Sequence, residues 1–430
     1  MSYFTDFVRG FLDLGATVIL PVVIFLLGLF FRQKIGAAFR SGLTIGVAFV
    51  GIFLVIDLLV KNLGPAAQAM VKNLGPAAQA MVKNLGVSLN VIDVGWPATS
   101  SIAWASSVAA FIIPLGIIVN VVLLVTKVTK TMNVDIWNFW HYTFTAAMVY
   151  AVSGSIWQAL LAAVIFQVIC LKVADWTAPM MSEFFDLPGV SIATGSTISY
   201  APGIYLVKLL QKVPGLNKLD ADPETIQKRF GAFGESIFVG LILGLGIGVL
   251  AGYKPGDIIN LGMSMAAVMV LMPRMVKILM EGLMPVSESA RTWLNKRFGE
   301  REIYIGLDAA VALGHPAVIS TALILVPITV LLAVILPGNQ VLPFGDLATI
   351  PFVVAFIVGA ARGNIIHSVI VGTIMIAISL YIATDVAPIF TDMAKGTNVQ
   401  MPKGSSEISS IDQGGNIVNY LIFKLFSLFN

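Results

Sequence analysis

The sequence predicts an all-α, polytopic membrane protein with about 10 to 11 membrane helices plus re-entrant segments. Of the 430 residues, 57% are hydrophobic and only 11% are charged, and the mean hydropathy is +0.91. Soluble domains carry about 25% charged residues, because each helix or strand needs a solvated face. Apolar runs close to the roughly 20 residues that cross a hydrocarbon core recur along the chain. Alternating strands of roughly ten residues, as a membrane barrel requires, are not visible in the sequence.

The first apolar run, from Phe11 to Phe31, is too long for the core of a signal peptide, and we expect a retained first span. The single Cys170 lies inside another apolar run, which excludes a disulfide framework and a cysteine-based metal site. The net charge is only +3 and the basic residues are scattered among loops, so nucleic-acid binding is excluded as well. No metal-ligand spacing and no cofactor motif stand out, and none is expected.

Ten membrane helices are predicted, at about 11 to 31, 41 to 60, 101 to 125, 136 to 153, 155 to 172, 231 to 251, 257 to 281, 317 to 336, 346 to 361 and 364 to 384. The stretches between some of them are interrupted by Gly and Pro, or are amphipathic or polar. We expect these at the interface, re-entering the membrane or outside it: 61 to 87, 173 to 210, 282 to 316 and 385 to 430. If the loop 32 to 40 is cytoplasmic, the cytoplasmic loops carry about twice as many Lys and Arg residues as the external loops. This excess predicts an external N-terminus. Arg274 and Lys277 then fall within a predicted span.

One repeat is exact and local. Residues 61 to 71 read KNLGPAAQAMV and are repeated without change at 72 to 82. Eleven residues close three helical turns, so the repeat suits a helix. We interpret it as a recent duplication that lengthens an external interfacial segment rather than as a binding device.

A second repeat is fainter. The pattern G-x-P-A-x-x-S occurs at 95 to 101 and again at 314 to 320, each time after an acidic residue, Asp93 or Asp308, and at the start of a long apolar span. The charge count gives the two spans opposite directions. This predicts an inverted-topology repeat, with residues 1-215 as the first half (re-entrant near 188-203) and 216-430 as the second (re-entrant near 303-316). A chance match of four residues is the alternative.

Ionisable residues inside a bilayer are costly and normally mark a site or pair with one another. Asp308 lies between glycines in Gly306 to Pro316, where a broken helix would let its carboxylate face a cavity. It is a candidate acceptor for substrate hydroxyls and the candidate catalytic residue, or else a helix cap. Asp93 precedes the other copy of the repeat and is a candidate for the same role, or else ends the external segment.

Aromatic and imidazole groups supply further binding candidates. Trp96 could stack on the C–H face of a sugar or anchor at the headgroups. His141 lies among aromatic residues, and its neutral ring suits a hydroxyl-rich ligand, although the aromatic residues could equally form an interfacial belt. His315 belongs to the repeat and is a weaker candidate, whereas His367 is expected to be structural.

The segment 186 to 203, DLPGVSIATGSTISYAPG, is rich in Gly, Pro and hydroxyl groups. It cannot cross lipid as an uninterrupted helix, but a re-entrant hairpin could present Ser196 and Thr197 to a polar, uncharged solute. It has no lysine of the kind found in a phosphate-binding loop, so nucleotide binding is not expected.

These residues carry a resemblance. The run Glu183 to Ser191 (EFFDLPGVS), the turn Gly195 to Thr197, the segment Gly306 to Ala309 and the overall layout resemble the galactitol-type IIC permeases of the bacterial sugar phosphotransferase system. The resemblance covers essentially the whole chain. It implies that the chain translocates a polyol across the bacterial cytoplasmic (inner) membrane, with galactitol as the first candidate. The lengthened segment at 61 to 87 departs from the family's pattern and leaves the alignment of Asp93 open.

The resemblance also implies partners. A IIA component passes the phosphoryl group to a cysteine on a separate IIB chain, which phosphorylates the sugar held by this chain. The related ascorbate permease is similar in layout, and this similarity implies that the present chain forms a homodimer in the membrane and moves a core domain by an elevator mechanism. It also implies a substrate pocket at the positions of Trp96, His141, Ser196 and Asp308. The basic loops at 208 to 229 and 291 to 301 are a possible docking face, or simply positive-inside loops. An ion-coupled secondary transporter of a polyol or sugar is the alternative function, and an intramembrane enzyme lacks the paired catalytic groups it would need.

Overall fold

The computed structural model describes residues 16–73, 89–216, 219, 221–230, 235–298, 302–343, 345–395, 397 and 406–428. The start of the predicted first span (11 to 15) and the second copy of the tandem repeat from residue 74 to 82 lie outside the described residues. So do parts of the two basic loops, including residues 217, 218 and 299–301.

The first half of the chain forms α2 (Ala16–Phe30), α3 (Ile35–Asn73), β1 (Val91–Asp93), α5 (Gly95–Ala105), α6 (Ala109–Val125), β2 (Thr131–Asn133), the 3₁₀ helix η1 (Trp137–Phe139), α7 (Trp140–Ser153), α8 (Ile156–Glu183), β3 (Val190–Ile192), α9 (Gly195–Ser199) and α10 (Pro202–Leu210). The second half forms α11 (Pro223–Phe230), α12 (Ser236–Leu250), α13 (Pro255–Phe298), β4 (Tyr304–Leu307), η4 (Ala309–Gly314), α14 (Pro316–Ile335), β5 (Val341–Leu342), η5 (Leu347–Thr349), α15 (Ile350–Ala360), α16 (Ile365–Asp385), α17 (Ala387–Ala394), β6 (Glu407–Ser409) and α18 (Ile417–Ser427).

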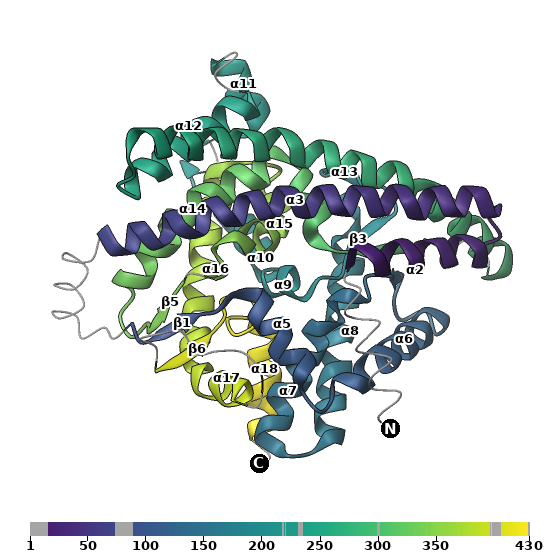
Figure 1. Ribbon diagram of the computed structural model, residues 1–430. Helices are drawn as coiled ribbons and strands as arrows, with labels where there is room; N and C mark the ends of the chain where they lie inside the picture. The colour runs from purple at the N-terminus through teal and green to yellow at the C-terminus, as the bar shows by residue number, and fades with distance from the viewer. Residues whose placement is uncertain are drawn as a thin grey trace.

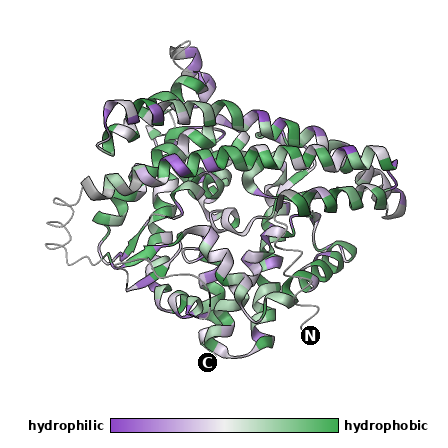
Figure 2. Ribbon diagram, viewed as in Figure 1, coloured by the Kyte–Doolittle hydropathy of each residue, from purple (hydrophilic) through white to green (hydrophobic). Residues whose placement is uncertain are grey.

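Four helices, α2, α3, α12 and α13, form one layer across the upper part of Figure 1, and apart from α11, which projects above it, the other elements lie mostly beneath this layer. The layer's long helices α3 and α13 are antiparallel: Gln33 donates to the carbonyl of Pro285 and to Ser289, whereas Gly51, further along α3, lies against Met275. Hydrophobic residues cover most of the layer and the body, and the hydrophilic α11 projects above them (Figure 2).

Each predicted span falls on a helix or a bent helix pair, which confirms the prediction of an all-α, multi-pass membrane protein. Among the described residues, five helices are long and apolar enough to cross a membrane, and α5 with α6 makes a sixth candidate if the pair counts as one broken span. The predicted span 101 to 125 is therefore not continuous, because α5 and α6 meet at 94°. The stretch 385 to 430, expected at the interface, re-entering the membrane or outside it, contains the short apolar helix α18.

The predicted ends of two spans were wrong. Helix α3 continues from the expected 41 to 60 through the first copy of the tandem repeat, and α13 continues through Phe298. At 1.5 Å per residue, the 44 residues of α13 extend roughly 66 Å, about twice a hydrocarbon core. Apolar residues such as Met263 are exposed near its start, whereas Arg274, Lys277 and Glu281 are exposed from its middle onward. The three charges therefore lie on an exposed face of α13 and not among buried side chains.

Six short strands in the described residues form two parallel sheets that the sequence did not predict. The strand orders are β5-β1-β6 and β2-β4-β3. Each sheet therefore takes its central strand from the opposite half of the chain. Each strand has two to four residues and is mostly buried, so it offers neither the length nor the alternation by which strands are recognised in a sequence.

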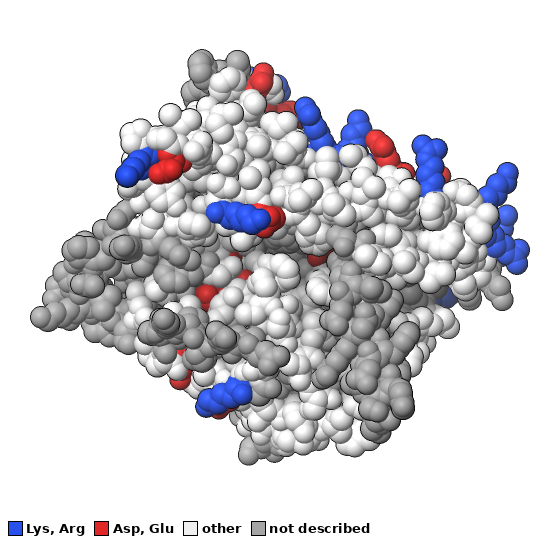
Figure 3. All heavy atoms as spheres, in the orientation of Figure 1, with Lys and Arg blue, Asp and Glu red and all other residues white. Residues whose placement is uncertain are grey.

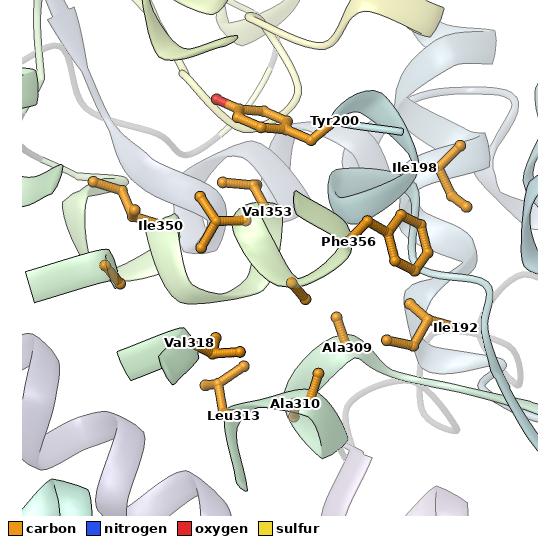
Figure 4. Packing of buried hydrophobic residues seen from close by; sticks show 14 of the residues in the cluster. Ile192, Ile198, Tyr200, Ala309, Ala310, Leu313, Val318, Ile350, Val353 and Phe356 are labelled. Atoms are coloured by element: carbon orange, nitrogen blue, oxygen red, sulfur yellow. The ribbon is translucent and has the colours of Figure 1, made fainter. Parts of the chain in front are cut away.

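The core that holds these sheets in place is a contact between short helices of the two halves. In Figure 4, side chains around α9 face α15, and η4 with the start of α14 lies on the other side of α15: Ile198, Tyr200, Ile350, Val353, Phe356, Ala309, Ala310, Leu313 and Val318. Burying each large apolar side chain contributes about 1.5 to 3 kcal/mol. The packing thus fixes the segments predicted to be re-entrant relative to each other.

Candidate functional site

The carboxyl ends of β2, β4 and β3 carry polar side chains at matched positions. Asn133 pairs with Gly306 and Ile192 with Leu307. Asp135 and Asp308 each follow the first of these pairs by two residues. Neighbouring strands lie about 4.8 Å apart, so the parallel register brings the two carboxylates to one edge. On the other side, the hydroxyl of Thr194 accepts a hydrogen bond of 2.9 Å from the amide of Ala309.

Asn138, in η1, lies between these two carboxylates. Its Nδ2 donates to Asp135 over 2.6 Å and also to Asp308. The second oxygen of Asp308 caps η4 by accepting from the amide of Ala310 at 2.6 Å. Asp308 is therefore a helix cap, one of the two roles expected from the sequence, and it also lines the pocket described below.

The other sheet has an equivalent acidic edge. Asp93 ends β1 opposite Ser409 of β6, and it accepts from the amides of Gly95 (3.1 Å) and Asp346 (2.8 Å). Asp346 in turn accepts from the amides of Trp96 (2.8 Å) and Asp412 (3.1 Å). Position 95 requires glycine, because its φ is +77° and a Cβ atom there would meet the backbone of Gly345. This lattice of backbone donors fixes the orientation of Trp96 and Asp412.

His141 and Ser196 connect the two sides. The Nδ1 of His141 lies 2.8 Å from the carbonyl of Asn138, which only accepts, so Nδ1 carries the proton. The neutral ring then leaves Nε2 to accept from the Ser196 hydroxyl at 3.0 Å. Ser196 accepts in turn from the Nε2 of Gln413, which also donates to Asp412 at 2.9 Å. Both ring nitrogens of His141 are thus occupied by the protein, and its ring stacks on Trp140 at 4.1 Å.

A pocket with a cavity volume of about 70 Å³ lies between the two acidic edges and the layer helix α3. Acidic side chains are visible in the furrow beneath this layer, whereas Lys and Arg gather along the outer edge above it (Figure 3). The walls combine large rings with polar groups: Phe53, Ile56, Trp96, Trp137, Asn138, Trp140, His141, Thr194, Ser196, Asp308, Thr349, Phe352 and Asp412. Carboxylates and hydroxyls with no Lys or Arg among the lining residues suit a neutral solute that donates hydrogen bonds.

The structure brings Trp96, His141, Ser196 and Asp308 into this one pocket. It places three other sequence candidates elsewhere. Asp93 is 1% exposed and supports the pocket through Asp346. Thr197 is not among the lining residues, because its hydroxyl donates to the carbonyl of Phe352 at 2.9 Å.

His315 lies against a different cavity, of about 710 Å³, which it shares with Arg362. Its Nδ1 accepts from the amide of Ala317 and caps α14, and its ring lies against Phe184 at 4.3 Å. The Nε2 of His367 donates to the carbonyl of Leu216 at 2.9 Å.

Asp412, Asn138, Thr349 and Phe352 were not predicted. Asp412 lies in SSIDQGGN at 409 to 416, a stretch of the same hydroxyl- and glycine-rich composition as 191 to 199. That likeness is the signal in the sequence that could have pointed to Asp412. No group of three or more His, Cys, Asp or Glu suited to a metal ion occurs within the described residues.

A polar pocket walled by short, broken helices in a multi-pass membrane protein is typical of the class of solute permeases. Residues 10–404 match the family model for the PTS system sugar-specific permease component, EIIC-GAT. The chain is 44% identical over 425 residues to the "PTS system galactitol-specific EIIC component" of Escherichia coli K12, covering 99% of this chain and 91% of the relative, and the O157:H7 protein matches equally. It is 39% identical over 418 residues to a "Putative permease IIC component" of strain K12, covering 97% and 93%. The chain therefore belongs to the EIIC-GAT family of phosphotransferase-system sugar permeases, confirming the resemblance seen in the sequence.

Proposed function

We propose that this permease binds galactitol, or a closely related hexitol, in the pocket between the two acidic edges and moves it across the bacterial cytoplasmic membrane. The observation that best supports this proposal is the pair of carboxylates that line the pocket, Asp308 and Asp412. Each follows a strand of a different sheet, β4 and β6 respectively. A polyol carries a donor on every carbon and no charge. Its hydroxyls can donate to both carboxylates while its C–H faces lie against the rings of Trp96 and Phe352. The 44% identity to a galactitol-specific component supports this choice of polyol.

The phosphoryl group must come from another chain. Cys170 is the single cysteine and is fully buried in α8, so it is not available as a phosphoryl carrier. We infer that a phosphocysteine on a IIB partner, recharged by IIA, phosphorylates the bound polyol. Asp308 would orient the attacking hydroxyl, since phosphoryl transfer depends mainly on positioning and electrostatics. The exposed Lys208, which shares a cavity of about 530 Å³ with Arg362, is a candidate for the docking face of IIB.

Two inverted halves, 1–215 and 216–430, are part of the same proposal. Among the described residues, each half contains a helix pair whose second helix is long, α2 with α3 and α12 with α13, followed by three short strands, and the second half has the additional short helix α11 before its pair. The antiparallel α3 and α13 are consistent with an inversion. We further propose that two copies assemble in the lipid bilayer as a homodimer, a state that cross-linking in membranes would test.

Uptake into vesicles tests the proposed function. Labelled galactitol should accumulate only as its phosphate, and only when phosphoenolpyruvate and the general carriers, IIA and IIB are supplied. Accumulation of unmodified galactitol driven by an ion gradient alone would overturn the phosphotransferase assignment in favour of an ion-coupled transporter. Binding of galactitol to the purified chain, measured without partners, tests the pocket separately.

A further inference from the structure

Asp135 is a buried carboxylate that neither the family assignment nor the proposed function uses. It is 3% exposed and lies at the edge of the sheet beside Asp308, brought there by the parallel register of β2 and β4. None of the ion pairs in the described part of the chain includes either carboxylate. Two like charges that contact the same Asn138 nitrogen, one of them buried, disfavour each other's ionised form, so one proton shared by the two groups stabilises the pair.

The hydrogen bonds of Asn138 define how the pair is joined. Its Nδ2 has two hydrogens and contacts both Asp135 and Asp308. Its Oδ1 accepts from the indole nitrogen of Trp140 at 3.2 Å. The flipped amide is excluded, because it would turn its NH2 group toward the indole N–H and its oxygen toward two carboxylates. Two amide hydrogens can support one carboxylate and one carboxylic acid but leave a second buried negative charge uncompensated.

Among the described residues, no cation pairs with either carboxylate. The titratable groups on the helices around the pair include His141, Tyr142 and Tyr150 of α7, Cys170, Lys172, Asp175 and Glu183 of α8, Asp412 after β6, and the exposed Arg274, Lys277 and Glu281 of α13, which packs against η4. Lys172 is exposed and donates to the carbonyl of Val128. His141 is a neutral acceptor toward Ser196, and Tyr142 accepts from Asn133 at 3.1 Å. Asp175 is held by Thr129, Thr131 and the amide of Lys130. The ion pair between Lys130 and Glu302 lies at the amino ends of the strands, away from the carboxyl edge.

We propose that Asp135 and Asp308 hold one proton between them across Asn138, and that Asp135 is the positioning residue that sets the charge presented by Asp308 to the solute. When a solute hydroxyl donates to Asp308, the shared proton resides on Asp135 and Asp308 is the ionised partner. When the pocket is empty, the proton resides on one group or the other, and the pair carries one proton in both cases. Only the role of the Asp308 charge in solute binding rests on the proposed function. The sharing of one proton between Asp135 and Asp308 is a property of the protein without solute.

Infrared difference spectroscopy of the purified, solute-free chain at neutral pH tests the sharing directly. The wild-type spectrum minus that of Asp135→Asn should show the loss of one protonated-carboxyl C=O band, and the same loss should appear with Asp308→Asn, because removing either partner lets the other ionise. A band that persists in one of the two variants would mean that the proton belongs to a single residue, and would overturn the proposal. Asp385→Asn is the matched control: this carboxylate is paired with Lys424 at 2.7 Å, and its loss should leave the band unchanged.

A second variant keeps the test decisive if either Asp→Asn protein fails to fold. Asn138→Ala retains both carboxylates and removes their shared donor, so the protonated band should remain and shift to the frequency of a less hydrogen-bonded carboxyl. Absence of any protonated band attributable to this pair in the wild type and in Asn138→Ala would refute the proposal. Neither spectrum requires galactitol, so failure of the proposed function, seen as a lack of polyol binding or of phosphorylation, would be recognised separately.

Discussion

Replacing Asp308 by Asn should remove most of the affinity for galactitol while leaving the fold in place. In the wild type, one carboxylate oxygen accepts from the amide of Ala310 and the other from Asn138, so the group is held rigidly at the pocket wall. Asn has only one acceptor oxygen. If that oxygen keeps the cap on η4, the new amide nitrogen faces the amide nitrogen of Asn138, and the site presents donors where the solute needs acceptors.

The magnitude follows from the bonds that are lost. A hydrogen bond to a charged group contributes about 1.5 to 3 kcal/mol, and each 1.4 kcal/mol is about tenfold in affinity. We therefore expect galactitol to bind roughly ten- to a hundredfold more weakly. Leaving the Asn138 donor without its charged acceptor should also lower the free energy of unfolding by about 1 to 3 kcal/mol.

Calorimetric titration of the purified protein with galactitol measures the affinity, and thermal unfolding in the same detergent measures the stability. Asp385→Asn serves as the control, since its partner Lys424 lies in α18 and Asp385 does not line the pocket. Unchanged affinity in a folded Asp308→Asn protein would refute the argument that this carboxylate receives the solute's hydroxyls.

Other substitutions separate binding from stability. Ser196→Ala removes the hydroxyl that joins His141 to Gln413, and titration should show galactitol binding weakened about tenfold. Thr197→Val breaks only a bond to a backbone carbonyl, so it should lower stability by about 1 kcal/mol in thermal unfolding with the affinity unchanged; a large loss of affinity would place its hydroxyl in the pocket after all. Gly95→Ala, at a φ of +77°, should cost at least about 1 to 2 kcal/mol of stability, and a thermally neutral variant would contradict the strained turn. Cys170→Ala should leave phosphoenolpyruvate-dependent phosphorylation of galactitol intact in vesicles, whereas its abolition would reopen the question of which chain carries the phosphoryl group.

The amino-acid sequence alone determined the class of protein, because the absence of charge over runs of about 20 residues has few physical solutions other than helices in lipid. It also determined that Asp308 and His141 are unusual, since ionisable groups are costly in that environment. It could not set where α3 and α13 end. Both helices continue past the hydrophobic thickness. The extension of α13 is stabilised by packing against the end of α2 and the start of α3, where Trp293 contacts Phe30 and Pro285 accepts from Gln33.

Only the tertiary structure decided which polar residues share a pocket. Asp308 and Asp412 are separated by about a hundred residues in the chain and face each other because β1 and β4 are exchanged between the two sheets. Strands of two to four residues leave no periodic pattern, and their pairing depends on partners distant in the sequence. For the same reason Thr197, adjacent to Ser196, turns its hydroxyl to the backbone of α15 and away from the pocket, whereas Asp135 reaches the edge where Asp308 lies.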